Sequence, residues 1–137
     1  MNRPLLVAAL LAASTTAIHV FVGTPEIAAP LLRSAIAPEV KLVLYACWHV
    51  VSCVLALSAG ALFFAAHPAR TVALRPLVTF VSWIWLASAL VFVLVALLQS
   101  GPKLPMLLAL PQWSVLGLTG ALALWAARRA VPDTDRA

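Results

Sequence analysis

Four long stretches without a charged side chain constrain the fold of this chain more than any other feature of its sequence. Every Asp, Glu, Lys and Arg lies between or beyond these stretches, which cover residues 4–25, 42–69, 76–102 and 104–127. A helix that crosses the hydrocarbon core of a bilayer needs about 20 predominantly apolar residues, so each stretch is long enough to cross it once. The sequence therefore predicts an all-α membrane protein with four transmembrane helices, near residues 4–22, 40–66, 76–99 and 105–127.

The composition agrees with insertion into a bilayer. Only 9% of the residues are charged and 64% are hydrophobic, whereas a soluble domain carries roughly 25% charged residues. The net charge of +5 comes from basic residues scattered along the chain, while binding to nucleic acid needs them clustered on one face. We therefore expect a single integral membrane domain over residues 1–137, with the lipid bilayer as its surroundings and no nucleic-acid partner.

The lengths of the connections predict how the helices are arranged. Short connections at residues 66–69 and 100–102 make the second, third and fourth helices neighbours that run in alternating directions. The expected architecture is a four-helix antiparallel transmembrane bundle. Residues 128–137 lack periodic apolar positions and are expected to form a short polar C-terminal tail.

The connection between the first and second predicted helices is longer. Residues 24–26 (TPE) are typical of a helix start, with an N-cap, a proline at the first helical position and an acid in the first turn. Apolar residues within 27–32 recur at helical spacing, which predicts a short helix lying at the membrane surface. An irregular loop is the alternative, because Pro30 would break or kink so short a helix.

The first apolar run has two interpretations. A basic residue near the start, followed by an apolar run and the small residues of 13–17, also fits a cleavable signal peptide. Apolar character continues through residues 18–22, past such a cleavage point, which favours a retained helix. The sequence alone leaves open whether this helix is retained or cleaved.

Basic residues near the ends of the spans predict their orientation. With four spans, both termini share one side of the membrane with the connection at residues 67–75. That side carries the larger set of Lys and Arg residues, which is Arg3, Arg70, Arg75, Arg128, Arg129 and Arg136. The opposite side carries only Arg33, Lys41 and Lys103. Since an excess of Lys and Arg marks the cytoplasmic side, we expect a multi-pass protein with both termini in the cytoplasm.

Polar side chains inside the predicted spans are the informative ones. No span contains Asp, Glu, Lys or Arg, which weighs against an ion-coupled carrier or pump. Counted along each helix, polar or amphipathic groups from three helices fall in the outer half of the membrane. The candidate ligand-binding residues are accordingly His19, Tyr45, Trp48, His49, Gln112 and Trp113.

The second predicted helix carries both cysteines of the chain. His49 and Cys53 lie four residues apart and share a face, with Tyr45 and Ser52 beside them, while Cys47 points elsewhere. Within one helix, Cys47 and Cys53 are too far apart for a disulfide, so both are expected to be free thiols. Ser52, Ala56 and Gly60 recur at four-residue spacing and form a small-residue seam that would let a neighbouring helix approach closely. We interpret it as ordinary packing, with a dimer face as the alternative.

Pro111 interrupts the fourth predicted helix. It cannot donate a hydrogen bond to the carbonyl of Leu107, and it should kink or loosen that turn. The freed carbonyl lies near the amide of Gln112 and the indole of Trp113, which together can build a polar pocket or a water site. Membrane helices also tolerate proline with no function attached, so both interpretations stay open.

Three functions of different class fit these features. His19 and His49 are candidate ligands of haem or copper, with Cys53 joining a metal, because imidazole suits both and thiolate suits Cu(I). His49 is alternatively an acid or base in a small lipid-directed enzyme or carrier. The interpretation that requires no specific motif is a non-catalytic membrane component that packs against itself or a larger membrane complex. We take this one and assign no catalytic residue.

Short motifs occur in three of the predicted spans and in the connection after the first. They are Ile18-His19 with residues 23–26 (GTPE) and 30–32 (PLL), then residues 45–49 (YACWH), and then residues 110–113 (LPQW). In these motifs the chain resembles a widespread kind of small four-helix bacterial inner-membrane protein. The resemblance implies the four-helix fold and a bacterial inner membrane as the location, and it implies no activity.

Overall fold

The computed structural model describes residues 1–130, and all regular structure in this part of the chain is helical. The elements are α1 (Arg3–Phe21), the π-helix η1 (Thr24–Ala28), α2 (Ala29–Arg33), α3 (Pro38–Ala65), α4 (Pro68–Thr71), α5 (Arg75–Leu98), α6 (Lys103–Ala109) and α7 (Gln112–Arg129). The all-α prediction is confirmed. Residues 131–137 of the expected polar tail lie outside the described residues.

Three helical segments of the described chain are long and apolar enough to cross a bilayer. They are residues 3–33, α3 with 28 residues and α5 with 24 residues. A fourth segment is long and apolar enough only when α6 and α7 are taken together, and these two helices meet at a bend of 71°. The bounds of α3 and α5 agree closely with the predicted helices at 40–66 and 76–99, while the first and fourth helices differ from the prediction.

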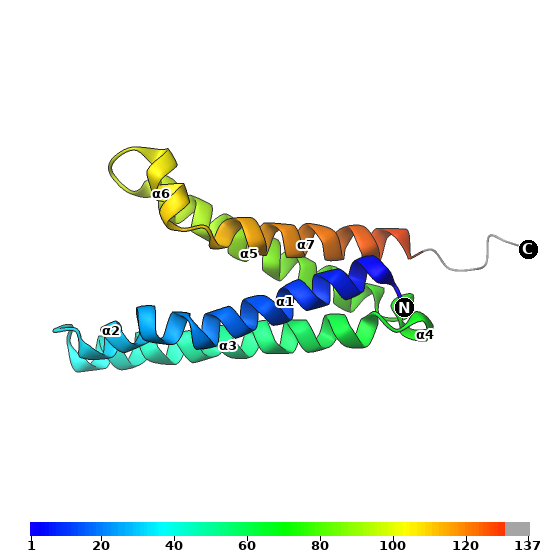
Figure 1. Ribbon diagram of the computed structural model, residues 1–137, viewed down its shortest axis with the longest axis horizontal. Coiled ribbons are helices and arrows are strands. Elements are labelled where there is room, and N and C mark those ends of the chain that lie inside the picture. Colours follow the sequence, from blue (N-terminus) through cyan, green and yellow to red (C-terminus); the bar gives the residue numbers. More distant parts are fainter. Residues whose placement is uncertain (131–137) are drawn as a thin grey trace, which may run out of the picture.

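The first helical segment continues past its predicted end at residue 22. Residues 3–33 form a run of 31 residues, and α2 packs against α3 (Figure 1). The surface helix expected after the first span is therefore a continuation of that span. A π turn makes this continuation feasible: the N–H of Ala29 bonds to the carbonyl of Thr24, five residues back, and the wider turn accommodates the proline rings at 25 and 30.

The fourth predicted helix, 105–127, is broken into two. α6 ends at Ala109, and Leu110 has φ −119° and ψ 63°, outside the helical region. α7 begins directly after Pro111. The resulting bend of 71° is sharper than the kink expected from the proline alone, because Leu110 leaves the helical conformation as well.

The long helices form two pairs, α1 with α3 and α5 with α7. Figure 1 shows that the pairs meet at the end of the molecule that holds the N-terminus and α4, and that they diverge toward α2 and α6. Contacts between α1 and α7 join the two pairs. We call these two ends the closed end and the open end.

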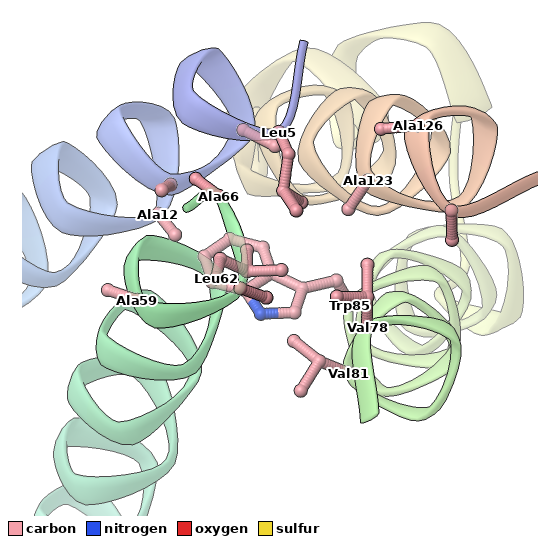
Figure 2. Close-up of a cluster of buried hydrophobic side chains, with 14 of the residues drawn as sticks. Leu5, Ala12, Ala59, Leu62, Ala66, Val78, Val81, Trp85, Ala123 and Ala126 are labelled. Atoms are coloured by element: carbon pink, nitrogen blue, oxygen red, sulfur yellow. The ribbon is translucent and has the colours of Figure 1, made fainter. Parts of the chain in front are cut away.

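Trp85 of α5 fills the place where the pairs meet. Its side chain is 2% exposed, and it belongs to a core built from all four long helices. Figure 2 shows its ring beside Leu62 of α3 and Val81 of α5, with Leu5 of α1 and Ala123 of α7 close by. Much of this core is alanine, so the helices approach closely around one large side chain.

Close backbone approach also holds α5 against α7. A Cβ atom added at Gly120 would lie 2.9 Å from both the Leu86 Cγ and the Ser82 backbone oxygen. At the closed end, the N–H of Asn2 donates to the carbonyl of Ala66 at 3.0 Å. The Asn2 side chain caps α1 by accepting from the N–H of Leu5 at 3.2 Å.

Within residues 1–130, Lys and Arg lie at both ends of the long helices and not between them. The closed end carries Arg3, Arg70, Arg75, Arg128 and Arg129, while the open end carries Arg33, Lys41 and Lys103. Two of the closed-end cations lie over aromatic rings: Arg70 is 3.9 Å from the ring centre of Phe64, and Arg129 is 4.2 Å from that of Trp125. The two sets of cations therefore lie at opposite ends of the long helices.

Candidate functional site

An aromatic stack joins α1 to α3 in the diverging half of the molecule. The imidazole of His19 lies on the indole of Trp48, with ring centroids 3.9 Å apart and planes 19° from parallel. The Nε2 atom of His19 lies 3.4 Å from the backbone oxygen of Trp48 and donates to it. The same oxygen accepts from the hydroxyl of Ser52 at 3.0 Å. The side chain of His19 thus fastens two helices together.

Gly23 forms the other side of the space that the indole occupies. It is buried, and a Cβ atom at this position would approach the Cη2 atom of Trp48 to 2.6 Å. Only glycine leaves room for the indole in this place. Sequence reasoning missed this role, although Gly23 follows His19 by four residues and therefore lies on the same face of the helix.

Tyr45 and His49 form a second aromatic pair, on α3 alone. Their rings meet edge to face, with centroids 4.6 Å apart and planes at 81°. Tyr45 is half-buried, but His49 is exposed. The two candidate histidines therefore differ, because His19 contacts another helix of the chain and His49 is exposed on the surface.

Cys53 continues the exposed side of α3. It lies one turn beyond His49 and is an exposed free thiol. Ala56 and Gly60 are exposed on the next turns, and a Cβ atom added at Gly60 would meet nothing within 4 Å. We call His49, Cys53, Ala56 and Gly60 the exposed α3 stripe. The buried residues of α3 face away from this exposed side. They are Leu55, Ser58, Ala59, Leu62 and Ala65.

Gln112 and Trp113 lie on the other pair of helices. Figure 1 shows α6 and the start of α7 diverging from α1 and α3. The structure brings His19, Trp48, Tyr45 and His49 into two neighbouring pairs on α1 and α3, and it does not bring Gln112 and Trp113 to them. The break before Gln112 turns α6 away, and α7 packs mainly along α5.

The break itself has an internal hydrogen bond. The indole N–H of Trp113 donates to the carbonyl of Leu107 at 3.1 Å, which is the carbonyl that Pro111 leaves without its helical donor. Ser114 donates to the carbonyl of Pro111 through its hydroxyl, at 2.7 Å. The predicted proximity of the freed carbonyl to the indole is confirmed, and the two groups satisfy each other.

Metal-binding side chains are dispersed in the part of the chain that the structure describes. Within residues 1–130, no three of His, Cys, Asp and Glu are grouped so that they could hold a metal ion. The three candidate metal ligands predicted from the sequence do not lie together. His19 contacts Trp48, while His49 and Cys53 lie on the exposed α3 stripe. One chain thus offers two adjacent metal-binding side chains.

A shallow groove of about 270 Å³ separates α3 from α5. Its lining comprises Val54, Leu57, Ser58 and Ala61 of α3 and Leu77, Phe80, Val81 and Ile84 of α5. Ser58 supplies the only polar side chain of this lining. The groove therefore offers an apolar surface and no pair of groups for acid–base chemistry.

Comparison of the chain with protein-family models, curated proteins and solved structures finds no match. The kinship with small bacterial inner-membrane proteins, inferred from short motifs, stays a prediction.

Proposed function

We propose that this chain is a non-catalytic component of the bacterial inner membrane that binds a protein partner through the exposed α3 stripe. It crosses the membrane four times as an antiparallel bundle, with the broken segment α6–α7 as its fourth span. Both termini and the closed end face the cytoplasm, and the open end faces the outside.

The distribution of apolar and charged groups supports insertion. Large apolar side chains are exposed along all the long helices, for example Leu57 at 75% and Phe80 at 64%, and a bilayer would cover them. In the described part of the chain, Lys and Arg lie only at the two ends, with more of them at the closed end. By the positive-inside rule, this excess supports a cytoplasmic location of the closed end. The Arg129 and Trp125 pair is typical of the membrane interface, where amphipathic side chains anchor a helix.

One observation carries the partner-binding role: His49 is exposed in the middle of an apolar helix. It lies eight residues after Lys41, roughly 12 Å along the axis, and would therefore reach the hydrocarbon of the outer leaflet. A polar group there is costly unless it has a partner. Several other polar side chains of the helices bond within the chain, as Ser82 does to Val78 and Thr119 to Val115.

The geometry favours this role over the two alternatives. A haem or copper site formed by His19 and His49 would need His19 to leave both the Trp48 ring and the Trp48 carbonyl. A lipid-directed enzyme would need a second reactive group beside His49, and the ring that contacts His49 belongs to Tyr45. A partner surface needs only exposed groups that lipid does not satisfy, and the stripe supplies them.

Photocrosslinking in native membranes tests the proposal. A photoreactive amino acid replaces Ala56 on the stripe, and in a matched control it replaces Ala87, which is exposed on α5. We expect a discrete protein adduct from position 56 and only lipid adducts from position 87. Equal behaviour of the two positions, with lipid adducts alone, would contradict partner binding through α3.

A further inference from the structure

The exposed α3 stripe carries two side chains that bind metals, His49 and Cys53. Residues four apart on a helix lie about one turn apart on the same face, so imidazole and thiolate can reach one ion. Both side chains are exposed, and the ring of Tyr45 meets His49 edge to face and restrains its orientation. Two such pairs would supply the ligands of a four-ligand site.

We infer that two copies of this chain pair through their exposed α3 stripes and hold one divalent metal ion of the zinc class between them. His49 and Cys53 of each copy are the four ligands. The inference rests on the proposed function, because it names the partner that the stripe binds as a second copy of the chain.

Symmetry explains why the partner is a second copy. A two-fold interface brings the same patch of both chains together, so a pair of ligands on one helix becomes a set of four. Structural zinc sites are tetrahedral and use four such ligands. Within residues 1–130, no third His, Cys, Asp or Glu joins His49 and Cys53 to complete a site inside one chain.

The surface around the ligands suits close approach of two helices. Ala56 and Gly60 follow on the same face, and small residues at four-residue spacing let membrane helices pack backbone to backbone. Space above Gly60 is open, since a Cβ atom there would meet nothing within 4 Å. No charged residue occurs between Leu42 and Ala69, so two copies of α3 would not repel each other along this surface.

Charge balance selects the class of ion. Each Cys53 loses its thiol proton on binding, and two thiolates neutralise the charge of one divalent cation, while the two imidazoles stay neutral. The complete site then has no net charge. Neutrality matters at this depth, because an uncompensated charge in hydrocarbon is costly. Zinc accepts this mixture of nitrogen and sulfur ligands in tetrahedral geometry.

The test uses the purified full chain in lipid nanodiscs, stripped of metal and titrated with Zn²⁺. We expect one tightly bound zinc ion per two chains, and a dimer by mass measurement of the detergent-solubilised protein. Co²⁺ in place of Zn²⁺ should give the visible absorption of tetrahedral thiolate-bound cobalt. His49→Ala and Cys53→Ser should each weaken zinc binding by more than about tenfold, whereas Cys47→Ser should leave it unchanged.

A second variant separates pairing from the ligands themselves. Gly60→Leu keeps both ligands but adds bulk where the second helix would lie, so it should lower the dimer fraction and weaken zinc binding together. Ala87→Leu on α5 is its control and should change neither. Because Gly60 faces open space in the single chain, a bulky side chain there should leave the fold of each copy intact.

The results that would overturn the shared zinc site differ from those that would overturn partner binding through the exposed α3 stripe. A stable dimer that binds no zinc, or one zinc per chain that Cys53→Ser does not affect, would overturn the shared metal site. A haem absorption band in place of zinc would overturn it as well. A monomer without zinc, combined with a protein adduct at position 56 in native membranes, would overturn the second copy and leave partner binding intact.

Discussion

His19 of α1 lies on the indole of Trp48 of α3, with their ring centroids 3.9 Å apart, and donates a hydrogen bond to the backbone oxygen of the same residue. Gly23 leaves the space in which the indole fits. These contacts fix α1 against α3 at a level where the two helix pairs diverge from each other. They also determine which of the two histidines remains exposed.

Substitution of His19 should therefore lower the free energy of unfolding, and by more when the aromatic ring is lost together with the hydrogen bond. His19→Ala is expected to lower the free energy of unfolding by about 1.6 kcal/mol, since it loses an aromatic pair worth roughly 1 kcal/mol and an interhelical hydrogen bond worth roughly 0.6 kcal/mol. His19→Phe keeps the stack and should lose only about 0.6 kcal/mol. Reversible unfolding in mixed detergent measures both. Equal losses for the two variants would show that stacking contributes nothing.

The bond between Trp113 and Leu107 should depend on Pro111. Trp113→Phe removes the indole donor and leaves the Leu107 carbonyl unsatisfied, which should cost about 1 to 2 kcal/mol. In a Pro111→Ala background, the N–H of the new alanine can bond to that carbonyl, so the same change should cost less than about 0.5 kcal/mol. A double-mutant cycle of unfolding free energies tests this coupling. Strictly additive losses would contradict it.

Close packing of α5 on α7 should make Gly120 irreplaceable. An alanine there would place its Cβ atom 2.9 Å from the backbone oxygen of Ser82, so Gly120→Ala should cost about 1 to 3 kcal/mol through overpacking. Gly117 on the same helix is the matched control, because its added Cβ would lie an ordinary 3.7 Å from Ala89. Gly117→Ala should be neutral or stabilising by up to about 1 kcal/mol. Equal melting temperatures for the two variants would contradict the account.

Much of the helical framework could be predicted from the charge-free stretches. The bounds of α3 and α5 follow from them, and so does the sorting of Arg and Lys to the two ends. The ends of the first and fourth helices could not be predicted, because they depend on how the backbone accommodates proline. A π turn carries the chain through Pro25 and Pro30, whereas at Pro111 the preceding Leu110 leaves the helical conformation.

For the candidate residues, relative directions along one helix could be predicted from the sequence, but the grouping across helices could not. Helical spacing placed Tyr45, His49 and Cys53 on one side of α3, because residues on one helix have fixed relative directions. The positions of Gln112 and Trp113 relative to His19 depend on a bend and on the packing of α7 along α5, which no local pattern encodes. The packing of the Trp48 indole against Gly23 likewise depends on how α1 and α3 are aligned along their axes.

A partner that covers the exposed α3 stripe in the membrane would shield Cys53 and leave Cys47 accessible. Both are exposed in the single chain, but Cys53 belongs to the stripe and Cys47 lies about 120° around the helix from it.

The measurement compares the rates at which a membrane-permeant thiol reagent labels Cys53 in the Cys47→Ser chain and Cys47 in the Cys53→Ser chain. Each rate in native membranes is divided by the rate for the same chain denatured in detergent. We expect Cys53 to be labelled several times more slowly than Cys47. Equal labelling of the two thiols in native membranes would contradict a covered stripe.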